Sequence, residues 1–598
     1  MKNTIKGGEF VVKQTHYNDI FIVEDFTEEQ QMMRESVTEF IDREVWPHKE
    51  KFEKKDYAFT EELMNKAGEM GFLSIAVPEA YGGMGMSFMS TILVCDYISG
   101  ASGSFATAFG AHTGIGTMPI VLYGTEEQKQ KYVPKLAMGE WFGAYCLTEP
   151  GAGSDANSGK TKAVLSEDGT HYKISGQKMW ISNAGFCSLM IVFARIENDK
   201  NLTAFIVEYN SENSNGITLG EEEKKLGIRA SSTRQVFFNE TIVPVENMLS
   251  TRQNGFKIAL NILNIGRIKL ASACLDACRR VISNAVNYAN ERKQFGTAIA
   301  NFGAVQEKIA LMTTKNFVTE CGVYRAAGDI QNKIDALEAD GMAHYNAELK
   351  GVEDFALECA ILKVYGSEVG QFVSDEGLQI YGGMGFSEDT PMEAAWRDAR
   401  ISRIYEGTNE INRLLTIGML MKKALKGEID LMTPAMAVAN DLMGIPSFDT
   451  PDYSALFSEE KEILEKLKKT FLMIAGKAVE KFGMDLEKQQ ELVLCAAEIL
   501  IEIYMAESAL LKTEKLASKT SEEEASLQIA MTKLNLFNAV ETINRKGKEA
   551  IISFTENDEQ RMLLMGLKRF TKYQIYPNII ALKKQIAKVA ISKNGYPC

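Results

Sequence analysis

In the segment ISRIYEGTNEINR (residues 401–413), an apolar run leads into the carboxylate of Glu406. Gly407 allows the backbone to turn sharply, and Thr408 or Asn409 fits a helix N-cap with an apolar stripe behind it. A carboxylate beside apolar side chains at an element boundary is poorly solvated, so its pKa should rise toward neutrality. That property suits a general base that removes a proton from a weakly acidic C–H group. The alternative is a half-exposed Glu at a helix start, because isolated carboxylates usually lie at the surface.

A glycine-rich turn is predicted in YCLTEPGAGSD (residues 145–155). The backbone around Pro150, Gly151 and Gly153 can approach a ligand closely, and Ser154 adds a hydroxyl donor. The segment lacks the lysine of a phosphate-binding loop, and it enters a β-domain instead of the βαβ unit of a dinucleotide-binding fold. It therefore indicates either a ligand-binding turn of another kind or an ordinary loop.

Three further segments could contact a ligand. In KMWISNAG (residues 178–185), Trp180 could stack on a flat heterocycle while the polar residues after it bond the edge, or it could be a core tryptophan. In ERKQFG (residues 291–296), Arg292 could pair with a phosphate, or it could lie at a solvated helix end. In LQIYGGMGF (residues 378–386), a pair of glycines leaves the backbone open to close approach.

Composition argues against several classes of protein. A chain of 598 residues is too long for one core, so three or four domains are expected. A net charge of -14 argues against nucleic acid as the main partner. The nine cysteines form no CxxC pair and the five histidines are dispersed, which predicts no metal site and a reducing compartment.

The two ends of the chain bear on where the protein is located. The first residues, MKNTIKGGEF, lack the apolar core of a signal peptide, and no stretch reaches the roughly 18 uninterrupted apolar residues of a membrane span. We therefore expect a cytoplasmic protein. Residues 561–598 contain eight Lys and Arg but no Asp or Glu, as do basic tails that contact anionic membranes. This composition would allow peripheral contact with the inner face of the membrane; the alternative is a C-terminal helix packed on the protein with its lysines in water.

The periodicity of apolar residues changes twice along the chain, from helical to strand-like and back to helical. A hairpin is expected at Asp168-Gly169, because alternating residues flank a turn-forming pair. The predicted fold is mostly α with a central β-domain. Its parts are an N-terminal extension (1–26), an N-terminal helical domain (27–144), a β-barrel or sandwich (145–254), a four-helix bundle domain that carries Glu406 (255–420) and an extra C-terminal helical domain (421–598).

Individual helices follow from the same periodicity. In the first three-quarters of the chain they are expected at 27–47, 60–70, 88–99, 104–123, 126–138, 256–292, 302–331, 335–380 and after Gly407. Pro434, Pro446 and Pro451 indicate a linker-like stretch. Beyond it, helices are expected at 458–482, 485–518, 521–554 and 557–593.

Taken together and in this order, the motifs resemble those of the acyl-CoA dehydrogenase family across residues 27–420. The overall length and the C-terminal extension are most similar to its very-long-chain branch. The resemblance implies a flavoenzyme that holds FAD between the β-domain and the bundle. It implies FAD contacts for Tyr145, Leu147, Thr148, Ser154, Trp180, Ser182, Arg292, Gln294, Phe295, Gln379, Gly382, Gly383, Thr408 and Glu410. Of these, Arg292, Gln294 and Phe295 would reach the FAD of a neighbouring subunit.

The reaction implied by the resemblance is α,β-dehydrogenation of a fatty acyl-CoA to trans-2-enoyl-CoA, the first step of β-oxidation. Glu406 would remove the α-proton while a hydride passes from the β-carbon to the flavin. Ser154, Asn264, Arg267 and Gly407 would lie on the substrate side. Some family members carry the base just before the arginine that matches Arg267, but here that residue is Gly266, so the role falls to Glu406.

The acyl chain length is expected to be medium to very long. At the floor of the acyl pocket the very-long-chain branch has two glycines three residues apart. Gly116 matches the first of them, whereas Pro119 stands at the second position, where it could narrow the pocket.

The resemblance also implies partners. Electrons would pass to an electron-transferring flavoprotein; the alternatives are an acyl-CoA oxidase that uses O2, or an assembly factor for respiratory complexes with secondary activity. A homodimer is expected, with residues 421–598 covering the surface through which family tetramers join two dimers.

Overall fold

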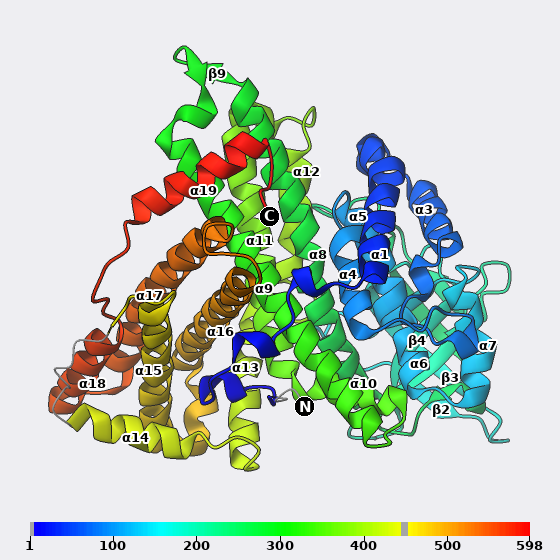
Figure 1. Cartoon of the computed structure of the whole chain (residues 1–598). Helices are drawn as coiled ribbons and strands as arrows, with labels where there is room; N and C mark the ends of the chain where they lie inside the picture. Colours follow the sequence, from blue (N-terminus) through cyan, green and yellow to red (C-terminus); the bar gives the residue numbers. More distant parts are fainter. Residues whose placement is uncertain (1–4, 444–451) are drawn as a thin grey trace.

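The computed structural model describes residues 5–443 and 452–598. Figure 1 shows a helical N-terminal domain beside a small β-domain, a central group of long helices, and a second helical domain on the far side of that group. The predicted fold class, mostly α with a central β-domain and an extra C-terminal helical domain, is confirmed. The long helices of the centre contact every other part, so they position the site.

The N-terminal domain consists of short helices around one apolar core. Its α-helices are α1 (Glu28–Phe40), α2 (Lys49–Glu53), α3 (Tyr57–Glu69), α4 (Phe88–Ile98), α5 (Gly103–Gly110), α6 (Met118–Tyr123) and α7 (Glu126–Ala137). Thr27 caps α1 as predicted, with its hydroxyl accepting the N–H of Gln30 at 3.2 Å. The helix predicted over 104–123 is present as one helical stretch, although it is not a regular α-helix throughout. A wide helical turn at Ala111–Gly116, which contains two glycines and precedes Pro119, separates α5 from α6.

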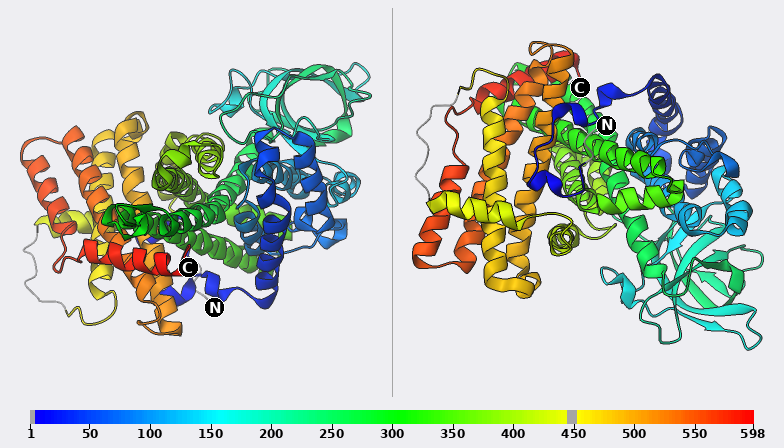
Figure 2. Two further views of the ribbon diagram at one scale, coloured as in Figure 1. Left: turned by 90° about the horizontal axis from the view of Figure 1, so that it is seen from above. Right: turned by 60° about the horizontal axis from the view of Figure 1, so that its bottom comes forward.

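The β-domain curls into a barrel-like layer, seen end-on in Figure 2 (left). Its strands are β1 (Gly143–Cys146), β2 (Lys162–Leu165), β3 (His171–Ser182), β4 (Leu189–Ile196), β5 (Thr203–Glu208), β6 (Ile217–Leu219), β7 (Thr233–Pro244) and β8 (Met248–Leu249). They pair in the order β6-β7-β3-β2-β4-β5-β8, with β1 beside β4. The hairpin predicted at Asp168-Gly169 joins the antiparallel strands β2 and β3, and Gly169 has a φ of 71°.

The central domain is built on three long helices, α8 (Gly255–Glu291), α9 (Gly303–Ala339) and α11 (Ala356–Tyr381), with α13 (Asn409–Leu425) beside them. The shorter α10 (His344–Asp354) and α12 (Met392–Ala399) complete it. The prediction of one helix over 335–380 is wrong, because α9 continues to Ala339 and the chain then turns through Gly341, whose φ is 88°.

Two helical stretches, 103–123 and 255–291, are long and apolar enough to cross a membrane by composition. In each of them most of the apolar window, 72% and 67% respectively, is buried inside the protein. Buried core helices show the same composition, so this finding does not by itself indicate a membrane span.

The C-terminal domain packs its helices against α9 and α13. Its α-helices are α14 (Met432–Met443), α15 (Ser458–Phe482), α16 (Gln490–Lys519), α17 (Ser526–Phe554), α18 (Asn557–Phe570) and α19 (Ile579–Lys593). Two predictions here are wrong. Pro434 lies in the first turn of α14, where a proline is tolerated, instead of in a linker, and the helix expected over 557–593 is broken before Pro577. Pro446 and Pro451 lie outside the described residues.

The N-terminal segment 5–26 lies across the junction between the central and C-terminal domains (Figure 2, right). The ring of Phe10 meets that of Tyr504 on α16 at 4.9 Å, and Lys515 on α16 donates to the carbonyl of Ile20 at 2.7 Å. On the central side, the N–H of Gly8 donates to Glu358 on α11 at 2.6 Å. The segment is therefore part of the packed interface between the two domains.

Candidate active site

Glu406 lies in a strained turn between a short 3-10 helix, Arg400–Arg403, and α13. Its φ is 58° and that of Gly407 is 82°, so two consecutive residues have left-handed backbones. Such a conformation costs a residue other than glycine about 1–3 kcal/mol and is found mainly where function fixes a side chain. Thr408 is the N-cap of α13, as predicted, and its hydroxyl accepts the N–H of Ile411 at 3.3 Å.

Polar side chains from three helices hold this turn. The amide of Asn412 donates to the carbonyl of Gly407 at 2.8 Å, and Arg267 on α8 donates to that of Glu406 at 3.4 Å. The ammonium of Lys363 on α11 also donates to the carbonyl of Gly407, at 2.7 Å. These bonds supply partners for carbonyls that the turn leaves outside any helix.

The carboxylate of Glu406 is shielded, although the residue as a whole is only half-buried. Its Oε2 has no contact with solvent and no hydrogen-bond partner in the described part of the chain. It lies over Gly266 on α8, where an added Cβ would come within 2.7 Å of Oε2. Burial raises the pKa of Glu406 to about 7, and the nearby charges of Arg267 and Lys363 oppose that rise. The predicted shift is thus confirmed, and the group can act as a base at neutral pH.

Asn264 and Arg267, predicted on the substrate side, lie together on α8 beside this turn. Both are buried, and the guanidinium of Arg267 donates to the side-chain oxygen of Asn264 at 2.7 Å. A buried arginine next to the Glu406 carboxylate provides a fixed positive charge beside it. Ser154 and Glu410, by contrast, are exposed at the surface.

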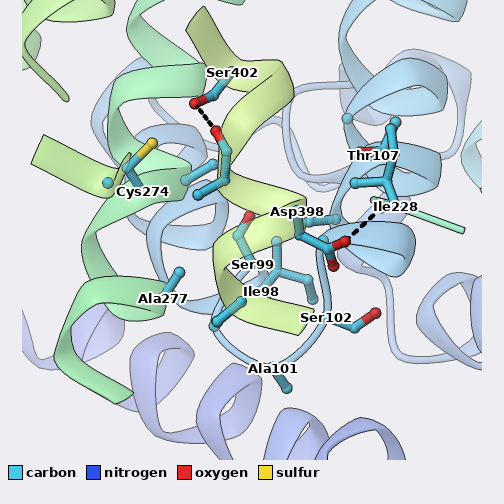
Figure 3. A pocket seen from close by; sticks show the side chains of 18 of the residues that line it. Ile98, Ser99, Ala101, Ser102, Thr107, Ile228, Cys274, Ala277, Asp398 and Ser402 are labelled. Atoms are coloured by element: carbon cyan, nitrogen blue, oxygen red, sulfur yellow. Dashed lines mark hydrogen bonds between the residues drawn. The ribbon is translucent and has the colours of Figure 1, made fainter. Parts of the chain in front are cut away.

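A cavity of about 470 Å³ begins at Glu406 and Ser182 and extends between α4, α5, α8 and α12 (Figure 3). Much of its wall consists of small residues, including Ala101, Ala106, Gly110, Gly114, Ala273 and Ala277. A Cβ added at Gly110 or Gly114 would meet no atom within 4 Å. The cavity thus offers a long apolar path away from the base.

The prediction that Gly116 and Pro119 form the floor of this cavity is wrong. Neither residue lines it. Gly116 packs against the backbone of Gly143 on β1, where a Cβ would lie 2.9 Å from the carbonyl carbon, and Pro119 is buried in the N-terminal core. The wide turn before α6 directs this part of the chain toward the β-domain.

The residues predicted to contact a flat heterocycle meet at the edge of the β-domain. Lys178 donates to the carbonyl of Leu147 at 3.2 Å and the N–H of Met179 donates to that of Thr148 at 3.0 Å, which brings the ends of β1 and β3 together. Trp180 follows with a φ of 59° in a bulge of β3 and with 53% of its surface exposed. Tyr145 is buried, and its hydroxyl lacks a hydrogen-bond partner within the described residues.

A second group of predicted residues lies far from Glu406. Arg292, Gln294 and Phe295 lie at the C-terminal end of α8 and in the hairpin of β9 (Lys293–Gln294) and β10 (Thr297–Ala298), while Gln379, Gly382 and Gly383 lie at the end of α11. All six are exposed, and Phe295 is 95% exposed. The stacked rings of Tyr288 and Tyr381, at 4.1 Å, hold the two helix ends together. Along α8 this group is about 37 Å from Arg267, so one chain alone does not join the two groups.

Two features of the site were not predicted. Lys363 contacts the turn Glu406–Asn409, here called the base turn, although it lies 43 positions before Glu406 in the sequence. The only signal was a lone lysine in the apolar stretch ALECAILKVYG (residues 356–366). The small residues of the cavity wall carried no signal, because alanine and glycine are frequent in any buried helix.

Comparison with known proteins gives a consistent result. Family models described as the acyl-CoA dehydrogenase N-terminal, middle and C-terminal domains match residues 27–140, 144–241 and 253–420, and a further C-terminal domain model matches 466–569. A probable acyl-CoA dehydrogenase of Bacillus subtilis is 41% identical over 98% of this chain and 97% of its own length. The very long-chain specific acyl-CoA dehydrogenase of Homo sapiens is 41% identical over a matched region that covers 58% of this chain and 51% of the human protein. The crystal structure of a Bacillus anthracis acyl-CoA dehydrogenase complexed with FAD covers 99% of this chain and 100% of its own, with a TM-score of 0.95 and 40% identity.

Proposed function

Since the chain belongs to the acyl-CoA dehydrogenase family of FAD-dependent oxidoreductases that act on CH–CH bonds, we propose that it converts a fatty acyl-CoA to trans-2-enoyl-CoA and passes the electrons to an electron-transferring flavoprotein. The observation that carries the proposal is Glu406, whose carboxylate has a pKa raised to about 7 by burial and which lines a largely apolar cavity. A base of that pKa is ionised in part at neutral pH and is strong enough for proton transfer from carbon.

The residues at the edge of the β-domain fit FAD. A half-exposed indole in a left-handed bulge and a buried tyrosine hydroxyl without a partner suit a flat ring with polar edges. Tyr145, Leu147, Thr148, Trp180 and Ser182 would hold the ring, and the cofactor would supply the hydride acceptor. Arg292, Gln294 and Phe295 would reach the cofactor of a second copy, which agrees with their exposure and with the proposed homodimer.

The protein itself supplies the groups that move and stabilise charge. Glu406 takes the α-proton of the thioester. Within the described residues the backbone N–H of Glu406 donates no hydrogen bond, so it is free to donate to the thioester carbonyl as negative charge develops there. Arg267, buried beside the same turn, favours that charge electrostatically.

Reduction of the flavin by substrate tests this function. Palmitoyl-CoA added without oxygen is expected to bleach the bound flavin within the time of one turnover. Recovery of colour should be slow in air and fast when oxidised electron-transferring flavoprotein is added. An unbleached flavin would contradict the dehydrogenase function, whereas fast recovery in air would identify an oxidase.

The cavity supports a long acyl chain as substrate. Replacing Gly110 with leucine would place a side chain in the open space along the wall. We expect kcat/KM for palmitoyl-CoA to fall about 10–200-fold, since one methylene in a fitted pocket is worth that much discrimination. For butyryl-CoA, whose chain ends nearer the base, kcat/KM should stay within about two-fold of the wild type.

A matched control for this variant is Gly418→Leu. Gly418 also lies in a helix with open space at its Cβ position, but it is on α13 and outside the cavity. Gly418→Leu should leave both substrates unaffected. Equal losses for the two substrates in Gly110→Leu would show that the chain does not run past Gly110.

The basic tail contacts the rest of the protein. On α19, Ile586, Ala587 and Ala590 are buried toward α9 and α17, while Lys584 and Lys588 are exposed. This is the alternative arrangement, a packed helix with lysines in water. Peripheral contact with a membrane and the cytoplasmic location stay predictions.

A further inference from the structure

Lys363 is a buried cation without an ionic partner. Its side chain is 0% exposed, and among the described residues it forms no salt bridge. Its ammonium donates to the carbonyl of Gly407 and to the side-chain oxygen of Asn409, each at 2.7 Å. Taking an ammonium out of water costs several kcal/mol, and two neutral acceptors recover only part of that cost. The desolvation cost of the Lys363 ammonium beside the base turn therefore suggests that this residue has a role in the site.

The charged groups that face Lys363 come from three elements. Glu406 is on the turn, Arg267 is on α8 and Glu368 is further along α11; the titratable thiol of Cys274, also on α8, is kept neutral because burial raises its pKa to about 12. Burial lowers the pKa of Lys363 to about 8, and the charge of Glu406 opposes this more than any other neighbour does. The carboxylate of Glu406 in turn has its pKa lowered by Arg267 and Lys363 against the effect of burial. The lysine and the base thus stabilise each other's charged form.

We propose that Lys363 is a positioning residue for the dehydrogenation proposed above: its ammonium fixes the Glu406–Asn409 turn through the carbonyl of Gly407, and its charge favours the ionised form of the base. The inference rests on the proposed function, since it assigns a role relative to Glu406 as the base. Arg267 supplies a second positive charge, but it bonds the Glu406 carbonyl at 3.4 Å, a weaker tether than the 2.7 Å bond from Lys363.

The acceptor of Lys363 is itself held in one orientation. The amide of Asn409 donates to Ser367 and to Glu368, each at 3.1 Å, which leaves its oxygen facing the ammonium. Arg413 donates two hydrogen bonds to Glu368, at 2.8 and 2.9 Å, and a further one to Glu498 on α16. The support of the base turn therefore extends into the C-terminal domain. Paired bonds of this kind restrict geometry more than a single bond does.

The test replaces Lys363 with methionine, which keeps the stem and removes the charge and both hydrogen bonds. We expect the acid limb of the pH profile of kcat to move up by about one pH unit, the shift typical of losing one nearby opposite charge. At pH 7 the ionised fraction of Glu406 would fall from about one half to about one-tenth, which corresponds to a loss of about five-fold in kcat. KM for palmitoyl-CoA should stay within about two-fold, since Lys363 does not line the cavity. Lys363→Arg retains the charge and should return the limb toward its original pH.

Lys468→Met is the matched control. Lys468 on α15 is almost as buried, with 4% of its side chain exposed, and it pairs with Glu507 at 2.6 Å. Its loss should lower stability and leave the acid limb in place. An unmoved limb in Lys363→Met, or an equal shift in Lys468→Met, would overturn the proposal.

A second measurement does not depend on turnover. The ionisation of Glu406 can be followed in the holoenzyme through the free energy of unfolding. This free energy is measured against pH for the wild type and for Lys363→Met, and the value for the same protein with Glu406→Gln added is subtracted from each. Because folding raises the pKa of Glu406, its contribution is present at low pH and is lost as the pH rises through the folded pKa. In Lys363→Met the stability contribution of Glu406 should persist to higher pH, by the same number of pH units as the acid limb of kcat moves. If the contribution is lost over the same pH range as in the wild type, the inference is contradicted. Failure of the wild-type flavin to bleach would instead contradict the proposed function.

Discussion

Glu406→Gln is expected to lower kcat by about 10²–10⁴-fold, the usual contribution of a general base. Glutamine has nearly the same shape, so it should keep the turn, the flavin content and the binding of acyl-CoA while it removes the proton acceptor. Anaerobic stopped-flow bleaching of the flavin measures the step directly. An exposed glutamate just beyond α13 provides the control: Glu428→Gln should bleach at the wild-type rate.

The pH dependence of the same two proteins makes the test sharper. In the wild type, kcat should rise with pH through about 7, because only the ionised form of Glu406 accepts a proton. In Glu406→Gln the residual rate should lack that limb. Residual turnover above one-tenth of the wild type, with the limb intact, would show that another group is the base.

Gly266→Ala should lower kcat by about 100-fold without lowering stability, because a misplacement near 1 Å in the reacting groups has an effect of that size. The new Cβ would lie 2.7 Å from Oε2 and 3.0 Å from Cδ of Glu406, closer than real contacts allow. The carboxylate would have to move from its place over α8. Alanine is the better helix former by about 1 kcal/mol, so the melting temperature should stay the same or rise.

The comparison that isolates this effect is Gly418→Ala, a helical glycine whose Cβ position is open. It should gain similar helix stability with no loss in kcat. Wild-type turnover in Gly266→Ala would mean that the carboxylate reaches substrate from a position other than the one in this structure.

Local patterns predicted the base turn, while features made by distant residues were missed. Gly407, the cap at Thr408 and the apolar approach to Glu406 all lie within eight residues, so their spacing alone predicted the turn. The raised pKa also followed from that neighbourhood. Lys363 could not be predicted, because its contact with the turn depends on how α11 packs beside α13.

The errors in the fold have the same origin. Periodicity predicted the long helices, but it continued them across Gly341 and across the glycines before Pro119, where a left-handed residue or a wide turn ends the regular helix. The acyl cavity was assigned to Gly116 and Pro119 by analogy of spacing, whereas Gly110 and Gly114 lie on its wall. The extra residue in the wide turn at Ala111–Gly116 changes which side chains face the cavity, and the periodicity of apolar residues in the sequence does not reveal it.

The position of the N-terminal segment has a consequence for biosynthesis. Phe10 and Ile20 leave the ribosome long before their partners Tyr504 and Lys515 on α16, which are translated nearly 500 residues later. At 5–20 residues per second, that is a delay of about half a minute to more than a minute and a half. During that interval the apolar side chains of this segment lack their native partners, and a chaperone could bind them. The segment 5–26 must therefore wait for α16 before it can reach its native place.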